Sequence, residues 1–171
     1  MADKHQEIQL SLLSFGWKLI DLKRDREALR CFNKSLTFTS DSSSIYFAKG
    51  LALDNLGRFD EAIASYDKAI EFKADKHEAW YNRGVALGNL GRFEEEIASY
   101  DKAIEFKADK HQAWYNKARC YALQGNFELA IENLQQAINL NPDECREWAK
   151  TDSDFDSVRE DGRFQTLIIN T

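Results

Sequence analysis

Apolar residues near the start of the chain recur at the spacing of one helix face. The members of this pattern are Ile8, Leu12, Phe15, Leu19 and Leu22. Steps of three and four residues return to the same side of an α-helix, so the pattern predicts a first helix with one apolar face. We expect this face to pack on the next helix and to close the amino-terminal end of the fold.

The middle of the chain copies itself. The segment IASYDKAIEFKADK at residues 63–76 returns letter for letter at residues 97–110, an offset of 34 residues. In the same register, HEAWYNR at residues 77–83 returns as HQAWYNK at residues 111–117. A fixed period of this length is typical of stacked units that each contact only their neighbours. The repeat therefore predicts a solenoid and not one closed core.

Each repeated unit has the pattern of two helices joined at a glycine. Gly57, Gly91 and Gly125 end one patterned segment, and a phenylalanine two residues later begins the next. Glycine in the left-handed conformation commonly ends a helix. Small residues recur where two antiparallel helices would approach closely, and an aromatic residue would fill the space beside them. Each unit is therefore predicted to be a helical hairpin.

The period and the residue types resemble those of the tetratricopeptide repeat (TPR), a 34-residue helix-turn-helix unit. The third unit carries the pattern as Trp80, Gly84, Leu87, Gly91, Phe93, Tyr100 and Ala103. The resemblance implies an all-α, right-handed superhelical α-solenoid of four helical hairpins followed by capping helices. The expected parts are an amino-terminal extension at residues 1–8, a degenerate first repeat at 9–42, repeats at 43–76, 77–110 and 111–144, and capping helices at 145–171.

The residues after Pro142 leave the repeat pattern but keep an apolar set. Its members are Phe155, Val158, Phe164, Leu167 and Ile168. The segment resembles the closing segment that follows the repeats in bacterial TPR proteins, and the last face of such an array must be covered. We expect it to seal the last repeat, and a lid over the binding groove is the alternative.

Composition and charge narrow the possible partners. The net charge of −6 argues against binding to a phosphate backbone, so we expect no nucleic acid partner. The three cysteines fall at unrelated repeat positions, which indicates neither a disulfide framework nor a metal site. The first residues lack a signal-peptide pattern, and no apolar run reaches membrane-spanning length. These features predict a cytoplasmic protein without a membrane partner.

No catalytic constellation stands out. His77 and His111 occupy the same repeat position beside Asp75 and Asp109, but such pairs one repeat apart cannot close around a single metal ion. The sequence has no Ser-His-Asp order and no glycine-rich phosphate loop. We expect no enzyme, no cofactor and no metal site, and favour a protein-protein interaction scaffold or adaptor.

Proteins of this family usually bind a protein or peptide on the concave face formed by the first helix of each unit. The resemblance places these residues on that face: Phe47, Ala48, Leu51, Asn55, Tyr81, Asn82, Val85, Asn89, Tyr115, Asn116 and Arg119. Two Tyr-Asn pairs one repeat apart would offer rings beside amides that can donate and accept hydrogen bonds along an extended peptide. The same residue types also brace neighbouring helices, so packing is the alternative role.

The carboxylate clamp that some family members use for a peptide C-terminus is incomplete here. Asn82 and Asn116 match its middle element. The first lysine and asparagine of the clamp are replaced by Leu13 and Trp17, or by Phe47 and Leu51. The last lysine and arginine are replaced by Gln112 and Asn116. Arg119 alone can meet one acidic group. A chaperone-tail adaptor of the usual type is therefore disfavoured.

Glu96 departs from the repeat. It stands where a sister unit has Ala62 at a close helix contact, and an unpaired carboxylate is costly to bury there. The resemblance places Arg83 on a facing helix, so an ion pair between the two is one interpretation. Lys117 is the equivalent base in the next unit, and the position there that corresponds to Glu96 holds an alanine. The Lys117 side chain is therefore expected to reach water without an acidic partner. We therefore favour local strain at Glu96.

A structural role is the second functional hypothesis. Near-identical repeats with incompletely sealed ends can stack head to tail into oligomers, so the chain would then be a self-assembling unit and a homo-oligomer. Mass measured across concentration distinguishes this hypothesis from the adaptor, because only assembly predicts growth.

Overall fold

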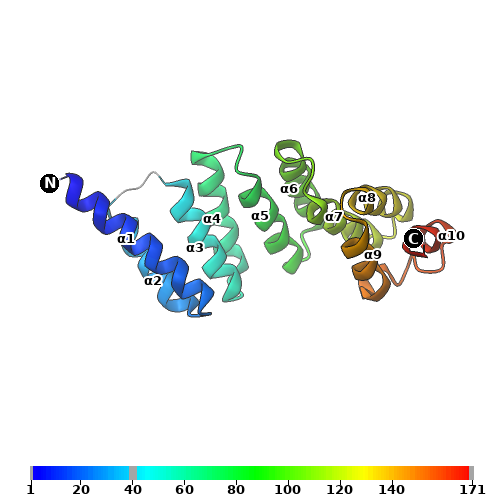
Figure 1. Cartoon of the computed structure of the whole chain (residues 1–171), viewed down its shortest axis with the longest axis horizontal. Helices are drawn as coiled ribbons and strands as arrows, with labels where there is room; N and C mark the ends of the chain where they lie inside the picture. Colours follow the sequence, from blue (N-terminus) through cyan, green and yellow to red (C-terminus); the bar gives the residue numbers. More distant parts are fainter. Residues whose placement is uncertain (1, 39–41, 170–171) are drawn as a thin grey trace. The chain divides into compact units, whose positions relative to one another are not determined.

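The computed structural model describes residues 2–38 and 42–169, and these residues contain helices and no strand (Figure 1). The helices are α1 (Ala2–Asp21), α2 (Asp25–Ser35), α3 (Ser43–Asn55), α4 (Phe59–Phe72), α5 (His77–Asn89), α6 (Phe93–Phe106), α7 (His111–Leu123), α8 (Phe127–Leu140), α9 (Pro142–Thr151), the 3-10 helix η1 (Ser153–Phe155) and α10 (Gly162–Ile169). The predicted all-α repeat fold is confirmed.

The turns inside the repeats are made by glycines in the left-handed conformation. Gly57 and Gly91 have φ of 70°, and Gly125 has φ of 75°. A side chain is disfavoured at such φ values, so each glycine ends one helix without strain and lets the next begin. This is the turn that the sequence pattern predicts.

The first compact unit of the chain extends to Gly91. In it α1 packs on α2, α3 packs on α2 and α4, and α5 packs on α4. Close approach of the paired helices depends on glycine. A Cβ atom on Gly16 would lie 2.3 Å from the Phe32 ring, and one on Gly50 would lie 2.5 Å from the Tyr66 ring. Both rings are fully buried, so the small residues leave room for the aromatic core.

The packing face of α1 differs from the prediction. Leu19 is buried in the core, but Ile8, Phe15 and Leu22 are exposed. The helix contacts α2 through other residues, including Gly16, which lies against the Phe32 ring, and Trp17, whose ring also lies near that of Phe32. The predicted contact face is therefore wrong for three of its five residues.

The second compact unit begins at Arg92. In it α6 packs on α7, α7 on α8, α8 on α9, and α10 on both α8 and α9. Phe155, Val158 and Phe164 from the closing segment are buried in the same core as Leu134 of α8. The segment after Pro142 is thus an integral part of this core, as sealing of the last repeat requires.

Candidate interaction surface

Helices α3 and α5 carry most of the side chains expected to face a partner, and the two helices contact each other. Asn55 and Asn89 are exposed, whereas Phe47, Leu51, Tyr81, Asn82 and Val85 are half-buried. The neighbouring Ala48 is fully buried and is therefore a packing residue. All of the predicted residues of α3 and α5 except Ala48 thus keep some access to solvent within the first unit.

Phe47 is held mainly by packing. Its ring centroid lies 6.3 Å from that of Trp17 and 6.0 Å from that of Tyr66. The ammonium of Lys76, just before α5, lies 4.7 Å from the ring centroid, within the range of a cation-π contact. These contacts fix the Phe47 ring in place. We therefore treat Phe47 as a packing residue at the edge of the surface and not as a residue that contacts a partner.

The asparagines of the first unit use their amide nitrogens within the protein. Asn82 Nδ2 donates to the Glu78 carbonyl at 2.8 Å, and Asn89 Nδ2 donates to the Val85 carbonyl at 3.0 Å, each one turn earlier on α5. Asn55 Nδ2 donates to Asp25 Oδ1 at 2.8 Å. These bonds orient the amides, and what each amide still offers to a partner is mainly its acceptor oxygen.

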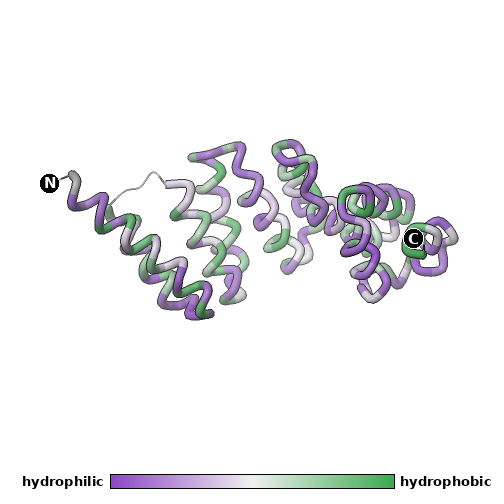
Figure 2. Tube along the Cα trace, in the orientation of Figure 1, coloured by the Kyte–Doolittle hydropathy of each residue, from purple (hydrophilic) through white to green (hydrophobic). Residues whose placement is uncertain are grey.

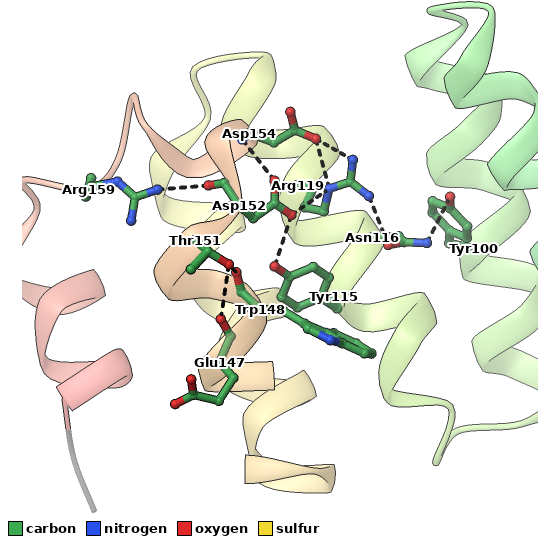
Figure 3. A network of polar contacts seen from close by, with 10 residues as sticks. All are labelled: Tyr100, Tyr115, Asn116, Arg119, Glu147, Trp148, Thr151, Asp152, Asp154 and Arg159. Atoms are coloured by element: carbon green, nitrogen blue, oxygen red, sulfur yellow. Dashed lines mark hydrogen bonds and ion pairs between the residues drawn. The ribbon is translucent and has the colours of Figure 1, made fainter. Parts of the chain in front are cut away.

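Arg119 of α7 is occupied by the closing segment (Figure 3). Its Nε donates to Asp154 Oδ2 at 2.9 Å and lies 3.1 Å from Asp152 Oδ2, while its Nη2 also bonds Asp154. Tyr115 donates its hydroxyl proton to Asp152 Oδ2 at 3.0 Å. The sequence pattern predicts an open arginine able to meet an acidic group of a partner, but the acids that it meets belong to this chain.

Tyr115 is not a surface residue. Its side chain is 4% exposed, and its ring contacts Trp148 and Phe155 edge-on at centroid distances of 5.2 and 5.6 Å. Burial raises the pKa of its hydroxyl, and the neighbouring Asp152 carboxylate adds to the shift. The prediction that Tyr115 offers its ring to a partner is wrong, because α9 and η1 cover it.

The two Tyr-Asn pairs are therefore not equivalent. Asn116 Nδ2 donates to the Tyr100 hydroxyl at 3.4 Å, and its Oδ1 accepts from Arg119 Nη1 at 3.3 Å. In the first unit Asn82 instead bonds its own helix. The second pair belongs to an internal polar network, and only the first pair lies on the surface of α3 and α5.

The charge state of Arg119 is firmly held. Burial disfavours its charged form, but the hydrogen bond to Asp154 and the charges of Asp152 and Asp154 outweigh burial and raise its pKa. The guanidinium therefore stays charged and paired. Asp152 and Asp154 were not identified from sequence, although the acidic run TDSDFD following an arginine-bearing repeat is a signal that could have suggested them.

Glu96 is buried at the helix contact, with 8% of its side chain exposed. Burial raises its pKa, and hydrogen bonds with Tyr100 and Cys120 and the charge of Arg119 oppose that rise. These groups all lie in the second unit. The raised pKa means that the folded protein disfavours the charged form of Glu96, and local strain at this position stays a prediction.

Basic residues at one repeat position form ion pairs with a preceding helix. Arg83 Nε donates to Asp67 Oδ1 of α4 at 2.7 Å, and Lys117 Nζ donates to Asp101 Oδ1 of α6 at 2.6 Å. The two pairs are copies of each other, one repeat apart. The expectation that Lys117 reaches water without an acidic partner is wrong, since Asp101 supplies one.

No group of three or more potential metal ligands occurs in the ranges 2–38 and 42–169. His111 Nε2 lies 2.9 Å from Glu144 Oε2, at the junction of α7 with α9. Across the described helices, none is long and apolar enough to cross a membrane.

Comparison with known proteins identifies the repeat. Residues 26–77, 47–111 and 111–144 match models of the tetratricopeptide repeat. The solved structure "Crystal structure of MamA" is 20% identical to this chain, with 81% of each chain covered and a TM-score of 0.77. "First TPR of Spaghetti (RPAP3) bound to HSP90 peptide SRMEEVD" is 19% identical, with 70% of this chain and 94% of that chain covered and a TM-score of 0.68. No curated protein matches the sequence significantly.

Proposed function

Because the chain belongs to the tetratricopeptide repeat family, we propose that it is a non-enzymatic scaffold that binds a protein or peptide on the first helices of its repeats. The observation that carries the proposal is the set of accessible amide and apolar side chains on two consecutive first helices. We call this set the α3–α5 surface: Leu51, Asn55, Tyr81, Asn82, Val85 and Asn89. The equivalent part of α7 is covered by α9 and η1, so the binding function is assigned to α3 and α5.

The chemistry of the surface suits an extended peptide. Asn82, Val85 and Asn89 are three and four residues apart, so they share one face of α5. The two amide oxygens lie about 10 Å apart along the helix, since each residue rises 1.5 Å. An extended chain covers that distance in about three residues, so the oxygens can accept two backbone N–H groups while the intervening side chain contacts Val85.

A peptide complex of a similar fold supports the choice of partner class. The RPAP3 repeat structure contains an HSP90 peptide, SRMEEVD. We assign the present chain a protein or peptide partner of its own, in the cytoplasm, with neither nucleic acid nor membrane as a partner. The net charge of −6 favours this assignment over binding to phosphate groups.

Affinity capture with matched variants tests the proposal. Asn82→Ala together with Asn89→Ala should weaken capture more than tenfold, because each lost hydrogen bond to a peptide backbone is worth about 1 kcal/mol or more. The control is Lys68→Ala with Lys102→Ala, two exposed residues of second helices that pair with Glu71 and Glu105. Loss of capture in the control, or unchanged capture in the asparagine variant, would contradict the proposal.

Head-to-tail stacking is less well supported. It requires an open apolar face at both ends of the array. Phe155, Val158 and Phe164 bury the apolar face of the last repeat under the closing segment. The first helix is different, since part of its apolar face is exposed.

A further inference from the structure

Helix α2 and the turn between α3 and α4 border a basic hollow that the proposed function does not use. The hollow has a volume of about 380 Å³, and no acidic residue of the described segments is among those that line it. Figure 2 shows hydrophilic positions recurring along α2. We call it the α2 hollow, and its lining residues are Arg26, Leu29, Arg30, Asn33, Leu56 and Arg58.

Two of the three arginines have no anionic partner. Arg58 binds the carboxylate three residues after it through hydrogen bonds of 2.7 and 2.6 Å. Arg26 and Arg30 are exposed, and neither makes a hydrogen bond or an ion pair through its side chain with any residue that the structure describes. Glu27 lies one turn before Arg30, but its carboxylate is held by Arg24 at 2.7 and 2.6 Å. The hollow therefore contains two unpaired positive charges.

The other repeats lack this charge. At the repeat position of Arg26 the other units have an acid, namely Asp60, Glu94 and Glu128. At the repeat position of Arg30 they have Ala64, Ala98 and Glu132. Two like charges one turn apart on a helix are destabilising, and the other units form the same kind of hairpin without them. The fold therefore does not require the two arginines, which favours a role in binding.

A lysine in an unfavourable backbone conformation adds to the basic surface beside the hollow. Lys23 occupies the repeat position of the three turn glycines, and its φ is 56°. A side chain is disfavoured at such a φ, so glycine would fit this position with less strain. Lys23 lines a second hollow, which shares Arg26 with the first and has three basic and two acidic lining residues. The chain thus keeps a cation where the backbone favours glycine, which agrees with a binding role for this part of the surface.

We infer that the α2 hollow binds an acidic segment of a protein partner, with one carboxylate on Arg26 and another on Arg30. Two carboxylates neutralise the two unpaired guanidiniums, and each guanidinium can bind its carboxylate through two parallel hydrogen bonds. The two arginines are four residues apart, so they share one face of α2 and lie about 6 Å apart along its axis. Alternate side chains of an extended peptide leave the same side about 7 Å apart. Residues i and i+2 of the segment can therefore supply both acids.

The charge of the whole chain favours a short acidic segment over a long polyanion. The net charge of −6 repels a polyanion, whereas a short segment meets mainly the local charge of the hollow. Asn33, one turn after Arg30, is exposed and adds an amide that can bond the peptide backbone. The α2 hollow shares no residue with the α3–α5 surface, so this contact goes beyond the proposed function and does not depend on it.

Nuclear magnetic resonance titration of the full chain with a blocked peptide of alternating glycine and glutamate tests the inference. The Nε–H signals of Arg26 and Arg30 should shift and saturate at millimolar peptide, and the matching glycine-glutamine peptide should bind at least about fivefold more weakly. Arg26→Gln with Arg30→Gln should weaken binding of the glutamate peptide by about fivefold or more. The control is Lys73→Gln with Lys107→Gln, which removes the same charge from two exposed lysines outside the hollow and should bind as the wild type does.

Thermal unfolding distinguishes a binding role of the two arginines from a structural one. The arginine variant should unfold at the wild-type temperature or above it, because the substitutions remove a repulsive pair. The inference is overturned if this variant unfolds at a clearly lower temperature, if the wild type shows no saturable shift, if the glutamine peptide binds equally well, or if the lysine variant loses as much binding. Tighter binding of inorganic phosphate than of the glutamate peptide would also overturn it and favour a phosphoryl ligand. Asn82→Ala with Asn89→Ala should leave this binding unchanged, so failure here leaves the test of the α3–α5 surface intact.

Discussion

Arg119 Nε lies 2.9 Å from Oδ2 of Asp154 and donates a hydrogen bond to it, which joins the fourth repeat to the segment that follows it. A guanidinium on this face of a TPR first helix is well placed to hold the carboxylate of a partner. Here the closing segment supplies the carboxylates itself. The contacts of Arg119 therefore stabilise the second unit, and the binding function that we propose uses α3 and α5 instead.

Asp154→Ala should destabilise the second unit. The substitution removes the strongest partner of a half-buried guanidinium and leaves Asp152 as its remaining carboxylate. Hydrogen bonds to charged groups contribute about 1.5–3 kcal/mol, so we expect a loss in that range by thermal or urea unfolding. The control is Asp156→Ala, which breaks an exposed pair with Arg159 and should cost less than about 1 kcal/mol. Equal losses would mean that the Arg119 contact is no stronger than a surface pair.

Glu96→Ala should stabilise the protein. The change restores the small residue of the sister repeats at a close helix contact, and consensus substitutions of this kind commonly add about 0.5–2 kcal/mol. The melting temperature should therefore rise at pH 7. A fall would show that the bonds with Tyr100 and Cys120 outweigh the cost of burial.

The effect of Glu96 should also depend on pH. Its pKa in the folded state is raised above the reference value of 4.5, so the folded state holds its proton more tightly than the unfolded state does. Below pH 4.5 Glu96 is protonated in both states, so the wild type does not pay for a buried charge. As the pH rises through the raised pKa, the carboxyl ionises and the free energy of unfolding of the wild type falls. The melting-temperature advantage of Glu96→Ala should grow from about pH 4 to about pH 7. A constant difference over this range would contradict the cost assigned to the buried carboxylate.

Phe155→Ala should be the most costly single change in the closing segment. The ring is fully buried against Tyr115 and Phe164, and truncation of such a ring typically costs about 3–5 kcal/mol. Hydrogen exchange should show faster opening of α7 to α10, while the amides of α1 to α4 keep their protection, because repeat units depend mainly on neighbours. Ile169→Ala, at a largely exposed residue, is the control and should change little.

The repeated parts of the fold were predictable because each feature occurs more than once in the sequence. Gly57, Gly91 and Gly125 mark the same turn three times, and all three adopt the left-handed conformation that the pattern requires. The ion pairs of Arg83 with Asp67 and of Lys117 with Asp101 are also copies. Asp67 and Asp101 were not predicted as partners from the sequence, although both recur in the duplicated segment. The acid and the base lie on different helices, and the way in which the two helices pack decides which acid lies near the base.

The parts outside the repeat were harder to predict. A stripe such as Ile8, Phe15 and Leu22 indicates an apolar helix face but does not say whether the core lies directly beneath it or beside it. The contacts of Arg119 with Asp152 and Asp154 connect residues more than 30 positions apart and have no copy elsewhere among the described residues. The 34-residue repeat does not determine either relationship, so the three-dimensional structure is needed to show which residues are in contact.

Partner capture by two single variants is the decisive test of whether binding uses the α3–α5 surface and not the equivalent part of α7. Asn82→Ala should lose most of the capture while keeping the wild-type melting temperature, because its amide nitrogen donates to the Glu78 carbonyl of its own helix and not to another helix's core contact. Arg119→Ala should lower the melting temperature but retain capture when assayed below its unfolding transition, since its contacts are internal. The opposite result, with capture retained by Asn82→Ala and lost by a folded Arg119→Ala, would place the binding surface on α7 instead.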